Sequence, residues 1–372
     1  MYIENAAQAQ VAVSFLPKLN STLSLPLVER CGGIEGFFRE RGQAFDAACR
    51  ECRVEPGIFD RGHALQEALR ELQTMERHGI HLCTIEDGMY PELLRHCEDV
   101  PLILYHKGNM SARAEDKFLA VVGTRKASAR CQERVGKVLN ELCGMGHRPV
   151  VVSGLAYGID ASAHRASLKC GLPTWAVCGI GLHTVYPSSH KALAESILSD
   201  SGALISEFPC GATVHPGNFL RRNRIVAGLC HATLVAESAL KGGSMATARV
   251  ALSYNREVMA FPGRPDDAYS AGCNLLIKEN VAALVENGLD VARILGYPEK
   301  RVQPQQAQLD LFGEEGQKHS VLTILEREGE VHIDELQART GIGVGELSAV
   351  LLQLELEGKI MGTKGQRYAR TL

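Results

Sequence analysis

The sequence contains no run of apolar residues long enough to cross a membrane, and its first residues lack a basic segment followed by an apolar one. A transmembrane helix needs about 20 mostly apolar residues, and a secretory signal needs a basic and then an apolar region. These absences predict a cytoplasmic protein that has no membrane partner.

The sequence also lacks the cysteine spacing of a metal site. Its 12 cysteines are scattered, and only Cys49 and Cys52 form a close pair. No second pair follows at the spacing that a zinc site requires. The pattern predicts reduced thiols, no bound metal and no cofactor.

Neither sign of charge is in large excess. The chain has 40 Lys and Arg against 43 Asp and Glu, which gives a net charge of −3. A surface that binds nucleic acid must therefore be a local basic patch. The phosphate-binding sequence G-x-x-x-x-G-K-[ST] is absent as well, so the common loop of nucleotide hydrolases is excluded.

What the chain does contain is enough apolar sequence for several cores. It has 372 residues, of which 45% are hydrophobic and 22% charged. This length exceeds that of one ordinary domain. We expect a small helical domain of the SAM or helix-hairpin-helix type over residues 1–75, and an extended Rossmann-like domain over 76–297. A linker rich in Pro, Gln and Glu over 298–316 then leads to a winged-helix domain over 317–372.

The segment 117–164 sets the fold class. An apolar strand at 118–122, a glycine turn and a helical pattern are followed by a second apolar strand at 149–152, a second glycine turn and a second helix. Unbroken apolar strands that alternate with helices predict an α/β fold with a doubly wound parallel sheet. The alternation continues to residue 285. Ligands of such sheets bind beyond the carboxyl ends of the strands, where the two turns lie.

The last segment has the pattern of a winged helix. Three amphipathic helices precede two short strands that can pair around Lys364 and Gly365. The third helix carries Glu346, Glu355 and Glu357 and few basic residues, so it is poorly suited to contact DNA phosphates. A transcription regulator that acts through this tail is therefore a disfavoured interpretation.

The first glycine turn is a candidate phosphate site. Gly123, Thr124 and Arg125 offer backbone N–H groups, a hydroxyl and a guanidinium at a helix entrance. The alternative is a tight turn with a solvated arginine. In the second turn, Gly154 permits the bend, and the Ser153 hydroxyl can face an anion.

The segment 219–224 is the strongest candidate for nucleic-acid binding. It places Phe219 beside Arg221, Arg222 and Arg224, just before a helix expected over 225–229. Arginines bind phosphates, and an aromatic face stacks on bases. The alternative is a solvated helix start with Phe219 in the core. Asn223 is expected to fix the loop by hydrogen bonds.

Two further groups have more than one interpretation. Asp160 and His164 are spaced i, i+4, so they could form an acid–base pair, but a helix cap and a structural histidine are favoured. Gly243, Ser244 and Thr247 resemble a phosphate-binding helix start.

Several separate motifs resemble those of the bacterial DNA-processing DprA (Smf) family. The resemblance is dense over residues 80–289 and is carried by the segments 122–125, 153–164, 206–209, 216–219, 222–229, 243–248 and 262–263. It implies a homodimer that binds single-stranded DNA without enzymatic turnover. It also implies protection of incoming DNA during natural transformation, displacement of single-strand-binding protein and loading of the RecA recombinase.

Two departures from the family pattern affect the site. Many members have a glycine-rich helix-hairpin-helix near the start, where this chain reads Leu-Pro-Lys-Leu-Asn at 16–20. Many also have a lysine after the Tyr-Pro of the third loop, where this chain has Ser188, so Lys191 is expected to substitute. The residues expected to contact DNA are Gly123, Thr124, Arg125, Lys126, Ser153, Gly154, Lys191, Phe219, Arg221, Arg222, Asn223, Arg224, Gly243, Ser244 and Thr247.

The competing interpretation is a nucleotide-processing enzyme similar to the lysine-decarboxylase-like (LOG) family. That family has Pro-Gly-Gly-x-Gly-Thr followed by a glutamate, whereas here Lys241 replaces the proline and the glutamate is missing. Without that carboxylate, general acid–base hydrolysis has no evident agent. The arginine cluster with Phe219 favours DNA binding over this alternative.

Overall fold

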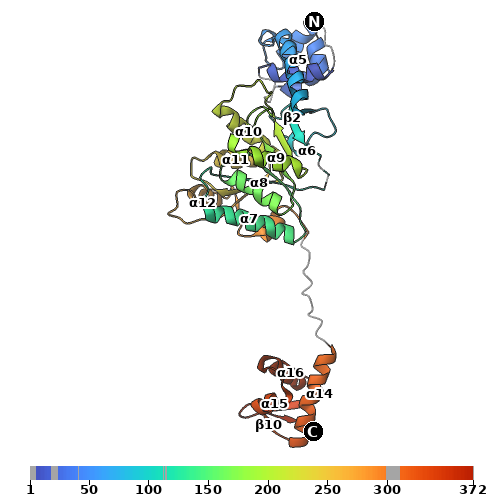
Figure 1. Cartoon of the computed structure of the whole chain (residues 1–372), viewed down its shortest axis with the longest axis vertical. Helices are drawn as coiled ribbons and strands as arrows, with labels where there is room; N and C mark the ends of the chain where they lie inside the picture. The colour runs from blue at the N-terminus through green and yellow to red at the C-terminus, as the bar shows by residue number, and fades with distance from the viewer. Residues whose placement is uncertain are drawn as a thin grey trace. The chain divides into compact units, whose positions relative to one another are not determined.

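The structure is a computed structural model, and it describes residues 6–17, 24–40, 42–111, 113, 115–298 and 311–371. The chain forms two compact units, residues 1–299 and 300–372. Figure 1 follows the chain from the N-terminal helices through a large sheet domain to the small C-terminal unit. Among the described residues, no helix combines the length and the apolar character needed to cross a membrane.

Helices form the beginning of the first unit. They are α1 Ala6–Ala12, η1 Val13–Phe15, α2 Ser24–Arg30, α3 Ile34–Arg39, α4 Gln43–Glu51, η2 Pro56–Ile58 and α5 Arg61–His78. Phe37 packs edge-on against Phe45 and Phe59 at centroid distances of 5.5 and 5.4 Å. The Ser14 hydroxyl lies 2.7 Å from the Tyr105 hydroxyl in the sheet, so these helices share a continuous core with the strands.

A sheet of nine strands organises the rest of this unit. The strands are β1 His81–Thr84, β2 Ile103–Gly108, β3 Phe118–Gly123, β4 Val150–Ser153, β5 Thr174–Val177, β6 Ala203–Ser206, β7 Ala232–Glu237, β8 Glu257–Ala260 and β9 Ala283–Leu284. Their order is β1-β2-β6-β5-β4-β3-β7-β8-β9. All neighbours from β6 to β9 are parallel, and β1 and β2 add an antiparallel edge. The predicted extended, doubly wound sheet is confirmed.

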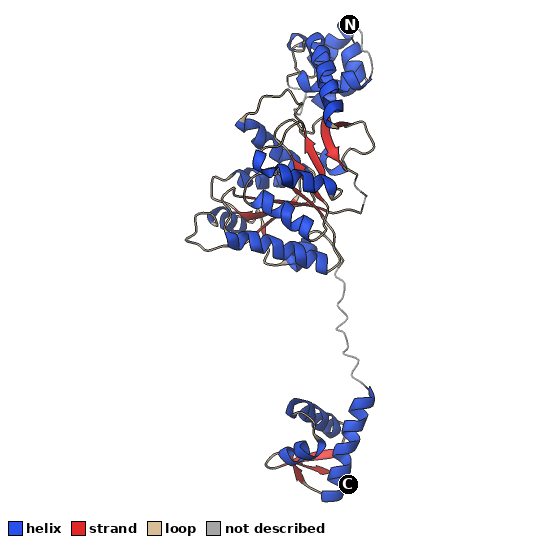
Figure 2. Cartoon of the chain, in the orientation of Figure 1, coloured by secondary structure: helices blue, strands red, loops and turns tan. Residues whose placement is uncertain are grey.

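Helices cover both faces of the sheet (Figure 2). They are α6 Glu92–Arg95, α7 Ala129–Gly144, α8 Ile159–Lys169, η3 Ser188–His190, α9 Lys191–Ser199, α10 Pro216–Gly228, α11 Gly243–Ser253, α12 Ala271–Lys278 and α13 Gly288–Ile294. Leu119 and Val121 of β3 point into a core shared with α7, α8 and α13. Ala120 and Val122 point the other way, into a core shared with α10, α11 and α12. Because both faces are buried, the central strands are apolar throughout.

One boundary differs from the sequence prediction in a way that affects the site. The helix expected at 225–229 begins at Pro216, so residues 219–224 are helical rather than part of a loop. Proline favours the first helical position because its φ angle is already helical and it has no N–H to satisfy. His215 caps the helix, accepting a hydrogen bond at Nδ1 from the Gly217 N–H at 3.0 Å.

The second unit is a winged helix, as predicted. It contains α14 Leu311–Glu328, β10 Val331–His332, α15 Ile333–Thr340, α16 Val344–Leu356, β11 Ile360–Thr363 and β12 Arg367–Arg370, with strand order β10-β12-β11. Val321, Leu336 and Leu351 form part of its own core. The first helix starts at Leu311, inside the segment expected to be a linker, and residues 299–310 of that segment lie outside the described residues.

Candidate nucleic-acid interface

The sheet has its topological switch point between β3 and β7. From β3 the chain winds outward through β4, β5 and β6, then returns to the other side of β3 and continues through β7, β8 and β9. The loops that follow β3 and β7 therefore diverge, and a crevice opens at the carboxyl ends of these strands. A pocket of about 500 Å³ lies there.

Most of the predicted DNA-contacting residues line this pocket, which we call the switch-point pocket. They are Gly123, Thr124, Arg125, Gly154, Phe219, Arg222, Asn223, Gly243, Ser244 and Thr247. Lys126 lines a neighbouring cavity. The linings of these two cavities do not include the described residues Ser153, Lys191, Arg221 and Arg224.

Phe219 presents a half-buried ring to the switch-point pocket. One edge lies against Gly179, where a Cβ atom would sit only 2.7 Å from the ring. The Tyr186 ring is 5.2 Å away at a tilt of 42°, and the guanidinium carbon of Arg125 lies 5.9 Å from the ring centroid. The ring is thus held by neighbours on its sides and remains partly open to the pocket, as a base-stacking surface requires.

Arg222 is buried beside the second glycine turn. Only 4% of its surface is exposed, and its guanidinium donates to the Val177 carbonyl. Gly154 allows this position, because a Cβ atom there would collide with the guanidinium. Burial lowers the pKa of Arg222, and the nearby carboxylate of Asp160 opposes that shift. Arg222 is therefore a charged wall of the pocket that also supports the turn.

Asp160 holds the same turn from the other side. Its carboxylate accepts hydrogen bonds from the N–H groups of Gly154 and Ala156 at 3.1 and 3.3 Å. Burial raises its pKa, against the opposing effects of Arg222 and of these N–H groups. The first turn fits closely on this one: Gly158 has φ +75°, and any Cβ atom there would collide with the Thr124 carbonyl.

His164 does not form an acid–base pair with Asp160. Its Nδ1 lies 2.7 Å from the Thr174 hydroxyl in a fully buried position. Burial lowers its pKa to about 3, with smaller contributions from Arg222 and His190. The imidazole is neutral at physiological pH, so the structural interpretation of His164 agrees with this arrangement. The helix cap expected of Asp160 is wrong: the N-cap of α8 is Gly158, which makes no side-chain cap, and Asp160 instead holds the turn before the helix.

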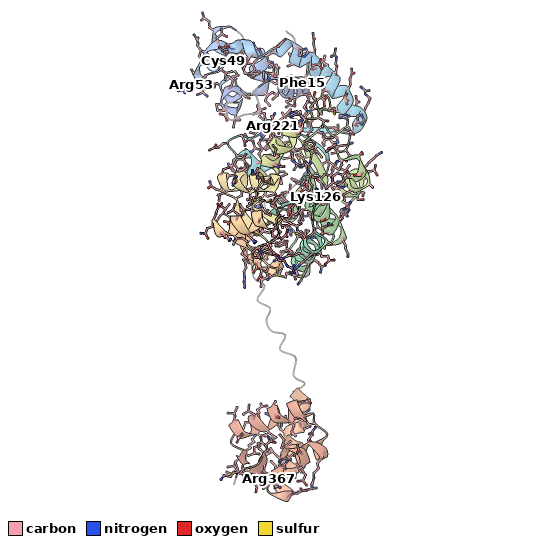
Figure 3. The ribbon with its side chains drawn as sticks, turned by 90° about the vertical axis from the view of Figure 1, so that its left-hand side faces the viewer. Phe15, Cys49, Arg53, Lys126, Arg221 and Arg367 are labelled. Atoms are coloured by element: carbon pink, nitrogen blue, oxygen red, sulfur yellow. The ribbon has the colours of Figure 1, made fainter. Side chains whose placement is uncertain are left out.

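Arg221 and Arg224 lie one helical turn apart and reach the same carboxylate. Oε2 of the buried Glu207 accepts from Arg221 at 3.0 Å and from Arg224 at 2.5 Å. Arg224 is 7% exposed and also donates to the Asp99 carbonyl, so it ties α10 to the loop before β2. Burial raises the pKa of Glu207, and the two arginines oppose this. In Figure 3, the exposed Arg221 lies nearer the N-terminal helices than Lys126 does.

Ser153 and Lys191 both lie outside the switch-point pocket, the first buried in the sheet and the second exposed on a helix. Ser153 is fully buried, and its hydroxyl donates to the Val121 carbonyl at 2.7 Å, so it joins β4 to β3 rather than facing an anion. Lys191 is exposed at the first position of α9. Neither location was evident from the motif alone.

The start of α11 forms the remaining wall. The N-cap residue is Gly242, so no side chain caps the first N–H groups of the helix. The Ser244 hydroxyl donates to the Ser238 hydroxyl at 2.8 Å. The first N–H groups of a helix have no partner within it, and they attract anions. Thr247 is buried, and its hydroxyl donates back to the Gly243 carbonyl at 3.3 Å.

The pocket also contains residues that sequence reasoning missed. Lys241 is exposed beside the start of α11, and Tyr269, from the loop after β8, is 37% exposed. Lys241 was noticed only as a departure from another family's motif. Tyr269 had no signal, because a loop residue far along the chain shows no pattern that links it to the first turn.

The pocket has little negative charge and no evident metal ligands. Asp160 is the one acidic side chain among its lining residues, all of which belong to the described part of the chain. Across the described residues, no group of three or more His, Cys, Asp or Glu side chains is placed to hold a metal ion. Its basic side chains, aromatic ring and helix N–H groups are suited to a ligand that carries phosphates and bases.

Comparison with known proteins gives consistent matches over both units. The family model for DNA recombination-mediator protein A matches residues 81–296, and that for the DprA winged helix domain matches residues 303–366. Protein Smf of Synechocystis sp. is 31% identical over 337 residues, which cover 81% of this chain and 84% of the relative. DNA processing protein DprA of Streptococcus pneumoniae is 41% identical over 208 residues, which cover 56% of this chain and 72% of the relative.

Solved structures agree with these matches. The X-ray structure of DNA processing protein A from Streptococcus pneumoniae has a TM-score of 0.64 at 30% identity and covers 77% of this chain and 95% of that one. A structure of DNA processing protein A from Helicobacter pylori, which addresses that protein's single-stranded DNA binding mode, has a TM-score of 0.50 at 26% identity. It covers 58% of this chain and 95% of that one. With one family model covering more than half of its residues, the chain belongs to the DprA (Smf) family of DNA-processing proteins.

Proposed function

We propose that this protein binds single-stranded DNA in the switch-point pocket, without sequence preference and more tightly than duplex DNA. Phe219 stacks on a base, while Arg125, Lys241 and the first N–H groups of α11 hold phosphates. Arg222, Asp160 and the glycine turns keep the pocket in shape. Of the remaining predicted residues, Arg221 and Lys191 add exposed positive charge around it, whereas Ser153 and Arg224 support the fold.

One observation carries this proposal: a partly open aromatic ring lies in a pocket with basic walls. The ring of Phe219 is fixed by Gly179 and Tyr186, and Arg125 stands 5.9 Å from its centroid. Stacking on such a ring is tolerant of sequence, because every base has a π face, and it requires bases that are not already paired and stacked in a duplex. The Helicobacter pylori relative, which binds single-stranded DNA, supports the same assignment.

Family membership supports the wider role. We propose that the protein acts in the cytoplasm during natural transformation, where it protects incoming single strands, helps displace single-strand-binding protein and loads RecA recombinase. No catalytic turnover is needed for these tasks, and none is proposed. The acidic third helix of the winged-helix unit suits contact with a protein better than contact with DNA phosphates.

An apolar surface supports the proposal that the protein works as a homodimer. Leu240 and Leu284 are 54% and 48% exposed, and with Leu275 and Ile277 of α12 they line a shallow cavity of about 420 Å³. Exposed apolar patches of this kind favour association with another protein surface. Sedimentation of the wild type and of Leu284→Glu tests this: we expect a dimer for the first and a monomer for the second.

The decisive experiment compares single-stranded with double-stranded oligonucleotides of one length in a gel-shift titration. We expect clearly tighter binding of the single strand, and equal affinity for both would overturn the proposal. Incubation with ATP and with nucleoside monophosphates, followed by chromatography, tests the nucleotide-processing alternative. Turnover that disappears in Thr247→Ala or Asp160→Asn would favour that alternative instead.

A further inference from the structure

A second cavity shares the lining residue Arg125 with the switch-point pocket. It has a volume of about 520 Å³ and lies between the turn after β3, the start of α8 and η3. Arg125 lines both cavities. The other charged groups here are Lys126 and Arg165, and none of its lining residues, all of them described, is acidic.

Tyr157 presents an aromatic ring in this second cavity. Tyr157 is 49% exposed, a high value for an aromatic residue. The hydroxyl lies 3.0 Å from the Ser189 hydroxyl, and the ring packs edge-on against His190 at 4.9 Å. His190 is itself buried and bonded to the Leu155 carbonyl at 2.8 Å. The ring is therefore fixed before any ligand arrives, which reduces the entropy lost on binding.

The cations around Tyr157 are available for a ligand. Within the described part of the chain, no ion pair involves Arg125, Lys126 or Arg165, and Lys126 is exposed. The arginines on α10 differ in this respect, because Arg221 and Arg224 share the carboxylate of Glu207. A cluster of unpaired cations around an open aromatic ring is the arrangement that single-stranded nucleic acids recognise.

We propose that this second cavity is an additional nucleotide subsite, in which Tyr157 stacks on a base and Lys126 and Arg165 hold the adjacent phosphates. The strand runs from Phe219 past Arg125 to Tyr157, and Arg125 contacts the backbone between the two rings. This inference rests on the proposed function, since it extends the same strand. It differs in predicting a dependence on oligonucleotide length that the switch-point pocket alone does not produce.

The test uses the full chain and two oligothymidylates, one of about 4 nucleotides and one of about 16, which bracket the usual site sizes of single-strand-binding folds. Fluorescence anisotropy gives the affinity of the wild type, Tyr157→Ala and Tyr157→Phe for each. We expect Tyr157→Ala to weaken binding of the long oligonucleotide by roughly 5-fold to 150-fold, the loss of one stacked base, and to leave the short one nearly unchanged. Tyr157→Phe should bind like the wild type, because it keeps the ring.

Charge is tested by the double variant Lys126→Ala/Arg165→Ala, with Lys169→Ala as the matched control. Lys169 lies on α8 one turn beyond Arg165, is exposed and lines neither cavity. For the long oligonucleotide, the double variant should reduce the magnitude of the slope of log affinity against log salt concentration by about 1.4, or about 0.7 per lost contact. The control should leave the slope unchanged.

The outcomes separate the two proposals. If the wild type binds single strands but Tyr157→Ala keeps full affinity for both lengths, the subsite is wrong and the switch-point pocket stands. If the cation variants weaken the long complex while Tyr157→Ala does not, the cavity holds no stacked base, and an acidic protein segment becomes its better occupant. If the wild type binds neither length, the proposed function itself fails. Equal thermal unfolding midpoints for all variants ensure that a lost affinity reports on the site.

Discussion

Replacing Phe219 by alanine tests the main site most directly. The substitution removes a half-buried ring that packs against Gly179 and Tyr186 and lines the pocket. If one base stacks there, single-strand binding should weaken by about 1–3 kcal/mol, which is roughly 5-fold to 150-fold in Kd. The unfolding free energy should fall by less than the 3–5 kcal/mol typical of a fully buried phenylalanine, since part of the ring is already in water.

The salt dependence of binding distinguishes the contribution of base stacking from that of phosphate contacts. Phe219→Ala removes no phosphate contact, so the plot of log Kd against log salt concentration should keep its slope. Arg125→Ala should instead reduce the magnitude of that slope by about 0.7, the value for one lost contact to a single strand. Arg249→Ala is the matched control, because this arginine is exposed on α11 and is absent from the lining of both cavities.

Phe219→Leu decides whether the ring stacks on DNA or only packs. Leucine retains apolar contact with Gly179 but has no π face. If Phe219→Leu restores the affinity that Phe219→Ala loses, the residue acts by packing and the stacking assignment is wrong. If Phe219→Ala unfolds the domain, Phe219 belongs to the core. A wild-type slope in Arg125→Ala would mean that the phosphates are held by other cations, with Lys241 and Lys126 the next to test.

Three further predictions concern two buried residues near the site and the C-terminal unit. Arg222→Ala should lower the unfolding free energy by about 1–3 kcal/mol, because it removes the donor to the Val177 carbonyl and a positive charge that favours the buried Asp160 carboxylate, and thermal or urea unfolding measures this. The folded-state pKa of His164 is lowered from 6.5 to about 3, so its contribution to stability is present above pH 6.5 and is lost as the pH falls toward 3. The urea midpoint of the wild type should therefore fall over that pH range, and His164→Gln should make this fall smaller. A chain without residues 317–372 should keep most of its single-strand affinity, because the Rossmann unit holds both cavities; a folded truncated protein that binds weakly in the gel-shift titration would contradict this.

The central sheet could be predicted from sequence because its physical signal is local. A parallel strand covered on both faces must be apolar at every position, and β3 and β4 appear as uninterrupted apolar runs followed by glycine turns. The turn glycines follow these strands directly in the sequence, although the contacts that require them come from elsewhere in the fold. Gly158 has a positive φ, and Gly154 faces a guanidinium, so neither position has room for a side chain.

The candidate site was harder to predict, because its geometry depends on helix phase and on distant loops. The sequence places three arginines within four positions, which suggests a single basic patch. With α10 beginning at Pro216, successive residues instead turn by about 100°, so Arg222 points toward the second glycine turn while Arg221 and Arg224 point toward Glu207. Tyr186 contacts the Phe219 ring and Tyr269 lines the pocket, and both lie on loops whose positions only the fold determines.

These differences change how charge in the site should be interpreted. Arg222 and Arg224 of α10 are both buried. Arg224 pairs with Glu207 and Arg222 donates to the Val177 carbonyl, so their loss should appear first as lost stability. The cations that can meet phosphates come from other elements: Arg125 and Lys126 after β3, Arg165 on α8 and Lys241 before α11. The chain as a whole has a net charge of −3, but the residues that line the two cavities include a single carboxylate, Asp160, which is buried. The proposed binding therefore depends on this locally basic surface. The buried arginines and the exposed cations that we propose to contact the strand are separate sets, and salt dependence should change only when the second set is altered.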